Sequence, residues 1–318
     1  MIVCKFGGTC TAYSSAIKNI KTILQKSSKR KIFVFSAIGK ENKQDIKVTD
    51  LLIDLSNDKE VEKCKNIILS KFEKLLKITG VNFDIKYHLD KDIEEYKKTN
   101  DKEKLLSRGE YYTTFVMSKY LKIKFVPAEK ILFFDGKNFD YQKSKARIEY
   151  YLKKYKHIAV PGFYFCDNGK IRLFSRGGGD VSGALCALIS NADIYENWTD
   201  VEGVFEVNPD ILKTKPIKTL SYQDLKFMTA MDASVVHSEC AKILQNTKTK
   251  LCVKSIFEPQ NKGTIISQNC HNSSRYICYK MCDDFVKIFV CESFDDFKVV
   301  LASKENYRET MKSLYENW

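Results

Sequence analysis

The sequence predicts an α/β protein whose sheet is mainly parallel and covered by helices on both faces. A strand, a glycine-rich turn and a helix follow one another at the N-terminus and again from Ile171. At least seven apolar segments of strand length also alternate with helical ones along the chain. Alternation of strands and helices is typical of parallel α/β units, in which both faces of the sheet are buried.

The composition is that of a globular protein. The 318 residues are 44% hydrophobic, enough for a sizeable core in one large or two ordinary domains. No apolar run is long enough to cross a membrane and no signal-peptide pattern opens the chain, so we expect a cytoplasmic protein with no membrane partner. The 11 cysteines include no C-x-x-C pair and are expected to be reduced thiols.

The net charge of +13 does not by itself indicate nucleic-acid binding. The lysines are spread along predicted helices between acidic residues, and no motif of a nucleic-acid-binding protein is present. We therefore expect no nucleic-acid partner, although the charge favours small anionic ligands.

The N-terminal unit begins with an apolar strand over residues 1–6 that carries Lys5 and ends in Gly7-Gly8-Thr9. Ser14 or Ser15 is predicted to cap the helix that follows. Lys5 places an ammonium group beside exposed N–H donors, which favours phosphate over a merely solvated lysine.

Residues 31–99 are predicted to form one buried strand, over residues 31–36, and three helices. A polar loop runs to Lys47, and Thr49 then either caps the next helix or contacts a substrate. The two amphipathic helices within residues 58–99 have no chemistry of their own and are interpreted as packing and a lid.

Residues 105–174 contain a helix, three short strands, a second helix and a hairpin. Glu110 lies near the start of the first helix, where the helix dipole alone would explain a carboxylate. Strands are expected at residues 124–126, 131–134 and 157–161, a helix at 144–154, and a hairpin around Asp167-Asn168-Gly169.

A second glycine turn, over residues 177–179, precedes the helix predicted from Val181. Three glycines before a helix suit an anion, and the flanking Arg176 and Asp180 strengthen that interpretation. The next strand closes on Thr199-Asp200, and a loop of the nucleotide-contact type follows, over residues 204–210.

The remaining chain is predicted to hold helices at residues 221–229 and 235–245 and strands at 250–256 and 263–267. From residue 269 a hairpin and one or two helices are expected. The Cys and His residues there fit no standard zinc spacing, so we expect no metal site.

Seven motifs, in order, are similar to those of aspartate kinase, a member of the amino-acid-kinase family. They cover about residues 1–268. The motifs are Lys5-Phe6-Gly7-Gly8-Thr9, Ser36-Ala37 with Thr49-Asp50-Leu51-Leu52, Gly109-Glu110, Pro161-Gly162-Phe163, the segment 176–180, the segment 198–203, and the segment 257–264.

The resemblance implies a three-layer αβα sandwich around a mainly parallel eight-stranded sheet. Residues 1–268 would form the catalytic domain, with amino-acid binding in its N-terminal half and ATP binding in its C-terminal half. Residues 269–318 would be a small α+β tail, interpreted as a remnant of an ACT domain. The implied reaction is ATP-dependent phosphorylation of the β-carboxylate of L-aspartate, the first step of lysine, threonine and methionine biosynthesis, and we expect a homodimer.

The resemblance also implies the roles of individual residues. Lys5 and Asp180 would be catalytic, with Asp180 orienting Lys5, because an ionised carboxylate substrate needs no general base. Magnesium would be held mainly by phosphates and water rather than by a protein ligand. The substrate-binding residues would be Ser36, Thr49, Glu110, Phe163 and Arg176, and the ATP-binding residues Lys5, Gly7, Gly8, Thr9, Thr199, Asp200, Phe205 and Asp210.

Departures from the family pattern leave two alternatives open. Asp210 and Ser234 stand where the pattern has cations, which would fit a catalytically impaired ligand-binding or regulatory homologue. Gly179 stands where the pattern has a serine, which would fit a kinase for another acidic substrate.

Overall fold

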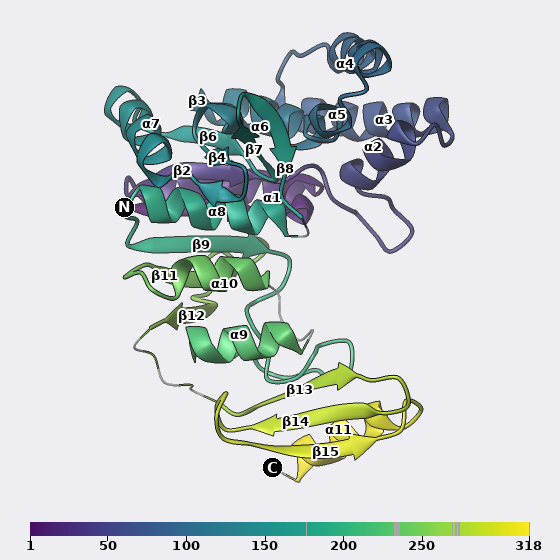
Figure 1. The fold of residues 1–318 in the computed structure, drawn as a ribbon, viewed down its shortest axis with the longest axis vertical. Helices are drawn as coiled ribbons and strands as arrows, with labels where there is room; N and C mark the ends of the chain where they lie inside the picture. Colours follow the sequence, from purple (N-terminus) through teal and green to yellow (C-terminus); the bar gives the residue numbers. More distant parts are fainter. Residues whose placement is uncertain (176, 232–235, 269, 271, 273, 318) are drawn as a thin grey trace. The chain divides into compact units, whose positions relative to one another are not determined.

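Residues 1–175, 177–231, 236–268, 270, 272 and 274–317 are described in the computed structural model. The chain divides into two units, Met1–Asp200 and Val201–Trp318 (Figure 1).

A five-stranded parallel sheet forms the centre of the first unit, in the order β9-β1-β2-β6-β3. Consecutive residues of β1, β2 and β6 are buried, and successive side chains of a strand point to opposite faces. Both faces of this sheet are therefore covered. The strands are β1 (Ile2–Phe6), β2 (Arg30–Phe35), β3 (Lys124–Phe125), β6 (Ile158–Pro161) and β9 (Ile194–Thr199).

The helices of the first unit cover this sheet and carry the loops at its edge. α8 (Gly178–Ile189) packs on β1, β2 and β9, whereas α6 (Arg108–Leu121) packs on β2, β3 and β6. The two amphipathic helices predicted within residues 58–99 are confirmed as α3 and α4. The other helices are α1 (Ser14–Lys26), α2 (Val48–Ser56), α3 (Val61–Thr79), α4 (Ile85–Thr99), α5 (Lys102–Leu106), α7 (Tyr141–Lys154) and the 3-10 turns η1 (Gly8–Thr11) and η2 (Ala128–Lys130).

A smaller sheet in the same unit has the order β5-β4-β7-β8. It contains the predicted hairpin, in which β7 (Tyr164–Asp167) pairs antiparallel with β8 (Lys170–Leu173). The turn residues Asn168 and Gly169 have φ of 47° and 81°, values that asparagine and glycine tolerate. The two remaining strands are β4 (Phe133–Asp135) and β5 (Asn138–Phe139).

The second unit begins with three strands and two helices. β10 (Thr219–Ser221) pairs parallel with β12 (Thr264–Ser267), which pairs antiparallel with β11 (Lys250–Ser255). The helices are α9 (Tyr222–Ala230) and α10 (Ser238–Leu244). The prediction of an α/β fold with a large, mainly parallel sheet is confirmed.

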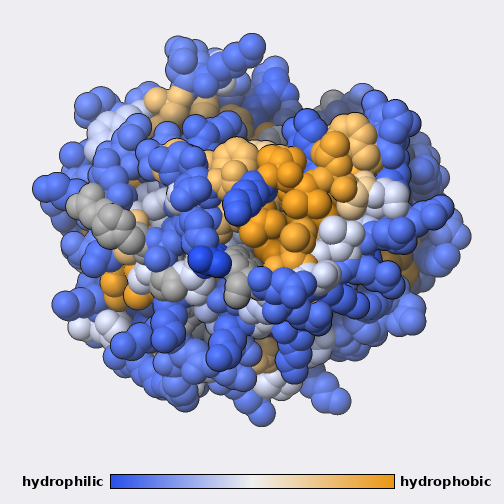
Figure 2. Space-filling model, turned by 90° about the horizontal axis from the view of Figure 1, so that it is seen from below, coloured by the Kyte–Doolittle hydropathy of each residue, from blue (hydrophilic) through white to orange (hydrophobic). Residues whose placement is uncertain are grey.

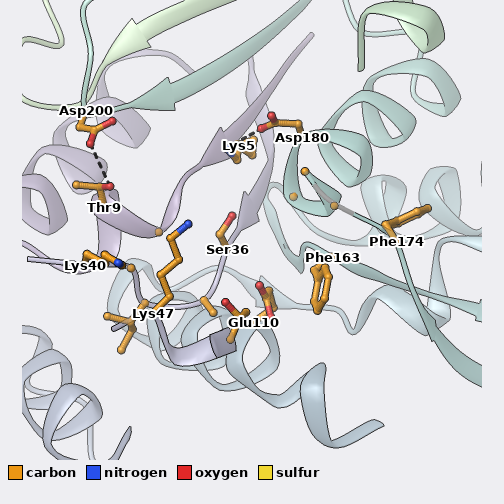
Figure 3. A pocket seen from close by; sticks show the side chains of 18 of the residues that line it. Lys5, Thr9, Ser36, Lys40, Lys47, Glu110, Phe163, Phe174, Asp180 and Asp200 are labelled. Carbon is orange, nitrogen blue, oxygen red and sulfur yellow. Dashed lines mark hydrogen bonds and ion pairs between the residues drawn. The ribbon is translucent and has the colours of Figure 1, made fainter. Parts of the chain in front are cut away.

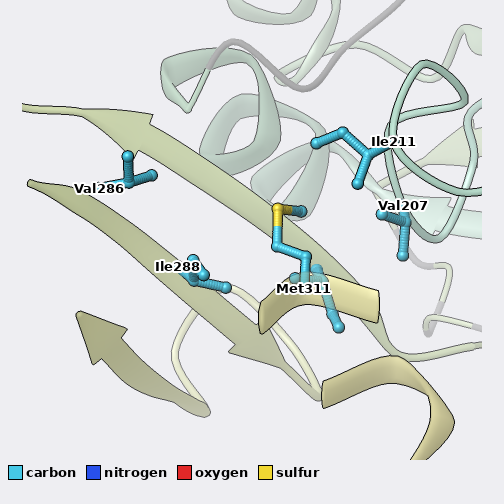
Figure 4. Close-up of a cluster of buried hydrophobic side chains, with 6 residues drawn as sticks. Val207, Ile211, Val286, Ile288 and Met311 are labelled. Atoms are coloured by element: carbon cyan, nitrogen blue, oxygen red, sulfur yellow. The ribbon is translucent and has the colours of Figure 1, made fainter. Parts of the chain in front are cut away.

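The C-terminal segment forms a three-stranded antiparallel sheet and one helix. The predicted hairpin is confirmed as β13 (Tyr276–Met281) and β14 (Val286–Cys291), but β15 (Phe297–Ala302) is a third strand where the sequence had suggested only helix. α11 (Tyr307–Glu316) completes the segment. Figure 4 shows its Met311 packed among Val207, Ile211, Val286 and Ile288, so this segment shares a hydrophobic core with the loop that precedes β10.

The two faces of β15 differ in burial. Val300 and Ala302 pack toward the core of Figure 4, whereas Phe297, Val299 and Leu301 point to the other face and are exposed. Figure 2 shows an apolar patch on the face that is turned to the viewer. Among the described residues, no helix is long and apolar enough to cross a membrane.

Two predicted helix caps are wrong. Ser14 is the first residue of α1, and the cap position is occupied by Tyr13. Thr49 lies inside the first turn of α2, and the cap position is Lys47, which makes no side-chain capping bond. The backbone before each helix is extended up to that point, so the helix begins one or two residues earlier than the polar side chain suggests.

Candidate active site

Lys5 and Asp180 form the centre of the site. The Lys5 Nζ lies 2.7 Å from Asp180 Oδ1, and both side chains are largely buried. Parallel pairing of β1 with β9 aligns Lys5 with Asn197, whose side chain accepts from Lys5 Nζ at 3.2 Å and donates to Asp180 Oδ1 at 3.0 Å. The ammonium of Lys5 is thus oriented by two side chains from different elements.

The glycine turn after β1 lines the same pocket as Lys5 and Asp180. Gly7 donates its N–H to the Trp198 carbonyl at 3.0 Å, so that N–H is already paired. Gly8 and Thr9 are the first residues of η1, and the first N–H groups of a helix have no partner within it. Thr9 also donates its hydroxyl to Asp200 at 3.4 Å. Gly8 and Thr9 are therefore the residues of this turn that can offer N–H groups to an anion.

The second glycine turn leads into α8. Gly177 adopts φ of 73°, a left-handed conformation suited to glycine, and α8 begins at Gly178. A Cβ at Gly179 would lie 2.6 Å from Ser36 Oγ and 3.4 Å from Lys5 Cε. The absence of a side chain at Gly179 therefore lets Ser36 and Lys5 approach the start of α8.

Phe163 lies in a strained backbone conformation at the pocket wall. Its φ is 77°, which costs a bulky residue on the order of 1–3 kcal/mol. Hydrogen bonds compensate, because its N–H donates to Ser182 Oγ at 3.0 Å and its carbonyl accepts from Phe174 at 2.8 Å. A Cβ at Gly178 would lie 2.7 Å from the Phe163 ring, so that glycine makes room for it.

Glu110 is a buried carboxyl group in the pocket wall. It is 4% exposed, and among the described residues its Oε2 has no hydrogen-bond partner. Burial raises the pKa of Glu110 to about 8, and a hydrogen bond from the Ala37 backbone only partly opposes the effect. A ligand ammonium would supply both the missing partner and the missing positive charge.

These groups surround one pocket of about 900 Å³ (Figure 3). Figure 3 shows Lys5 and Asp180 at one side and Glu110 with Phe163 at another, with Ser36 between them. The structure thus brings most of the sequence-predicted residues together. The predicted residues that line the pocket are Lys5, Gly8, Thr9, Ser36, Thr49, Glu110, Phe163, Asp180 and Asp200.

Five predicted site residues are not among these lining residues. Arg176 lies outside the described residues. Gly7 and Thr199 lie directly beside the lining residues Gly8 and Asp200, and Thr199 donates its hydroxyl to Asp200 at 3.0 Å. Phe205 and Asp210 belong to the second unit, where Phe205 forms an isolated bridge with Pro216 and Asp210 donates its N–H to Asn208.

Sequence reasoning missed several residues of the site. Asn197 gave no local signal, since only strand pairing places it beside Lys5. Gly39, Lys40, Lys43 and Lys47 belong to the segment interpreted only as a polar loop, although all four line the pocket. The available signal for this loop was Gly39, which follows Ser36 by three residues, just after a buried strand ends.

The described residues contain no group of three or more His, Cys, Asp or Glu side chains placed to hold a metal ion. The ionisable groups of the lining include the ammoniums of Lys5, Lys40, Lys43 and Lys47, the carboxylates of Asp180 and Asp200, and Glu110, whose pKa is raised by burial. This set of groups suits an anionic ligand that carries its own cation.

Comparison with known proteins agrees with this geometry. The model of the amino acid kinase family matches residues 1–255. Aspartokinase 3 of Bacillus subtilis is 27% identical over 295 residues, which is 86% of this chain and 65% of the relative. An aspartokinase of Rickettsia conorii is 26% identical over an alignment that covers 100% of this chain and 74% of the relative. The chain thus spans less than two thirds of the length of the Bacillus relative.

Solved structures give the same result. The aspartate kinase of Clostridium acetobutylicum is 31% identical with a TM-score of 0.79, and the match covers 90% of this chain and 67% of that one. The E. coli aspartokinase III in complex with aspartate and ADP has a TM-score of 0.70 at 19% identity, over 90% of this chain and 66% of that one, a similarity of fold.

Proposed function

The chain belongs to the amino acid kinase family, and we propose that it is an aspartate kinase, which transfers the γ-phosphoryl group of ATP to the β-carboxylate of L-aspartate. The observation that carries this proposal is the pairing of opposite chemistries in one pocket. Glu110 offers a buried carboxyl whose Oε2 has no hydrogen-bond partner among the described residues, whereas Lys5 and the Gly8-Thr9 turn offer positive charge and N–H groups. The ammonium of an amino acid needs a carboxyl partner, whereas an acidic side chain and a phosphate need positive charge and N–H donors.

The reaction requires positioning and charge neutralisation rather than proton transfer. A β-carboxylate oxygen of aspartate forms a bond to the γ-phosphorus, and the bond from that phosphorus to the β,γ-bridging oxygen breaks. ADP leaves with the electron pair, and the product is an acyl phosphate. The attacking carboxylate is already ionised at neutral pH, so no general base is needed.

Each described residue then has a specific task. Lys5, oriented by Asp180, binds the transferring phosphoryl group, and Gly8 and Thr9 donate N–H groups to it. Glu110 binds the α-ammonium of aspartate, while Ser36, Thr49 and Phe163 line the amino-acid side of the pocket. Magnesium, held by phosphate oxygens and water, neutralises phosphate charge when the nucleotide is bound.

The proposal extends to residues outside this pocket. Arg176 binds the α-carboxylate, and Thr199, Asp200, Phe205 and Asp210 contact the nucleotide. Residues 1–268 form the catalytic domain, residues 269–318 form a small α+β segment related to an ACT domain, and the protein acts as a cytoplasmic homodimer.

A hydroxamate assay tests the proposal. Purified protein with ATP, magnesium, L-aspartate and hydroxylamine should form aspartyl hydroxamate, and L-glutamate should not compete at equal concentration. The control is Asp180→Asn, which should form far less. Folded wild-type protein that forms no hydroxamate would contradict the proposal, and preferred turnover of another acid would change the substrate.

A further inference from the structure

A lysine-rich loop borders the pocket and has no role in the proposal above. Residues 39–47 are the larger part of the connection between β2 and α2, and Lys40, Lys43 and Lys47 all line the pocket. Figure 3 shows the Lys47 side chain extended into the pocket between Thr9 and Ser36. Within the described part of the chain, these three lysines form no ion pair.

Among the described lining residues, the loop lysines decide the sign of the net charge. Lys5 is balanced by Asp180, Asp200 adds one negative charge, and the raised pKa of Glu110, about 8, leaves that carboxyl mostly neutral at pH 7. The other described lining residues outside the loop are uncharged. Without the three lysines the described lining would be net negative, whereas with them it is net positive, as anionic substrates require.

A buried ammonium holds this loop in place. Lys71 of α3 is 8% exposed, and its Nζ donates to the Gly39 carbonyl at 3.0 Å and to Asp45 Oδ2 at 2.6 Å. Asp45 also accepts the backbone N–H groups of Glu41 and Ile46, each at 2.8 Å. One side chain therefore ties both ends of the loop to α3.

The loop also packs directly on the glycine turn after β1. Gly39 donates its N–H to the Gly8 carbonyl at 3.0 Å, and a Cβ on Gly39 would lie 2.6 Å from the Gly8 carbonyl carbon. Only glycine permits this approach, and Lys40 follows at once. The start of the loop, with Lys40, is thereby held beside the turn that carries the N–H groups of Gly8 and Thr9.

We propose that residues 39–47 form an anion-binding element, in which Lys40 and Lys47 bind the phosphoryl group that is transferred. Lys71 is the positioning residue that holds this element through Gly39 and Asp45. The inference rests on the proposed kinase activity. It supplies cations to a chain whose sequence has Asp210 and Ser234 where the aspartate kinase pattern has positive charges.

The double variant Lys40→Met/Lys47→Met tests the binding role. We expect kcat/KM for ATP to fall about 100-fold, mostly through kcat, because charge stabilisation is lost where charge develops. The affinity for inorganic pyrophosphate, measured by calorimetry, should fall about tenfold or more. The control is Lys74→Met, since Lys74 pairs with Glu41 of the same loop but is exposed and does not line this pocket. A double variant that matches Lys74→Met in both measurements would overturn the proposal.

Lys71→Met tests the positioning role. We expect faster amide hydrogen exchange in residues 39–47 and a kcat lowered about tenfold, and Lys71→Arg should restore both in part. Asp45→Asn is the second variant. It removes the charged partner of Lys71 but keeps the buried Lys71 side chain in place, and it should accelerate hydrogen exchange of the same amides. Unchanged exchange in Asp45→Asn, with an unchanged kcat, would overturn the assignment.

The outcomes separate this inference from the proposed function. In one outcome, wild-type protein forms no hydroxamate but binds pyrophosphate in a manner that depends on Lys40 and Lys47. That result would contradict the aspartate kinase activity and support the anion-binding role of residues 39–47. Normal hydroxamate formation by the double variant would contradict the anion-binding role of residues 39–47 and leave the proposed aspartate kinase activity unchallenged.

Discussion

The side chains of Lys5 and Asp180 meet at 2.7 Å although 174 residues separate them in the chain. Lys5 comes from β1 and Asp180 from the first turn of α8, and Asn197 of β9 contacts both. Three elements thus fix the direction of one ammonium group. Such pre-organisation is what phosphoryl transfer requires, because little reorganisation then remains during the reaction.

Asp180→Asn should lower kcat about 100-fold, with smaller changes in KM. Asparagine keeps an oxygen for Asn197 but loses the charge that holds the Lys5 ammonium. Steady-state kinetics of hydroxamate formation provide the measurement. Asp193→Asn is the control, since Asp193 is an exposed carboxylate paired with the N-terminal ammonium. If kcat stays within about threefold of wild type, the role of the pair is structural.

Glu110 should make aspartate binding depend on pH. Its pKa of about 8 means that the free site must lose a proton before it binds an ammonium. Between pH 6 and 8 the affinity for L-aspartate should therefore rise by about tenfold per pH unit and level off above that range. Calorimetry at pH 6.5 in buffers of different ionisation enthalpy should detect the released proton.

Glu110→Gln is the matched variant for that measurement. Glutamine keeps the size of the side chain but cannot ionise, so the affinity at pH 7 should fall about tenfold or more and the pH dependence should disappear. A variant that retains the same slope would show that another group titrates.

Gly179→Ala should raise KM for L-aspartate about tenfold, a cost typical of one extra methyl group in a packed site. The new Cβ would lie 2.6 Å from Ser36 Oγ, so that the hydroxyl must turn away from its position. In the double variant Ser36→Ala/Gly179→Ala the clash is absent, and the two effects should therefore be less than additive. Strict additivity would mean that the two residues act independently.

Glu196→Gln should lower the free energy of unfolding by about 3–5 kcal/mol, because it leaves a buried guanidinium without its charged partner. Glu196 accepts from Arg30 at 2.8 and 2.9 Å and from the Trp198 ring at 3.1 Å, and its side chain is 7% exposed. Urea unfolding at pH 7 is the measurement. Glu60→Gln, at an exposed pair with Lys63, should leave the midpoint unchanged. Equal midpoints for the two variants would contradict the prediction.

Much of the fold was accessible from local patterns. Buried strands such as residues 32–35 read as continuous apolar runs, and Asn168-Gly169 marked its hairpin turn. The third C-terminal strand was missed because one of its faces is exposed, with Phe297, Val299 and Leu301, and the other packs against the cluster that contains Met311, a cluster that exists only in the folded chain. The caps of α1 and α2 were misplaced because a polar residue within the first turn gives the same sequence signal as a cap.

The sequence by itself determined most of the order of strands, glycine turns and helices, the family and, through the resemblance to that family, the pair of Lys5 with Asp180. These depend on short-range rules: the period of apolar residues, the freedom of glycine and the residue types of the motifs. Only the tertiary structure decided that Asn197 lies between those two side chains, that Gly39 touches Gly8, and that a lysine of α3 holds the loop over the pocket. It also decided the raised pKa of Glu110, because burial is a property of the packed chain and no local pattern encodes how much water remains around one carboxyl group.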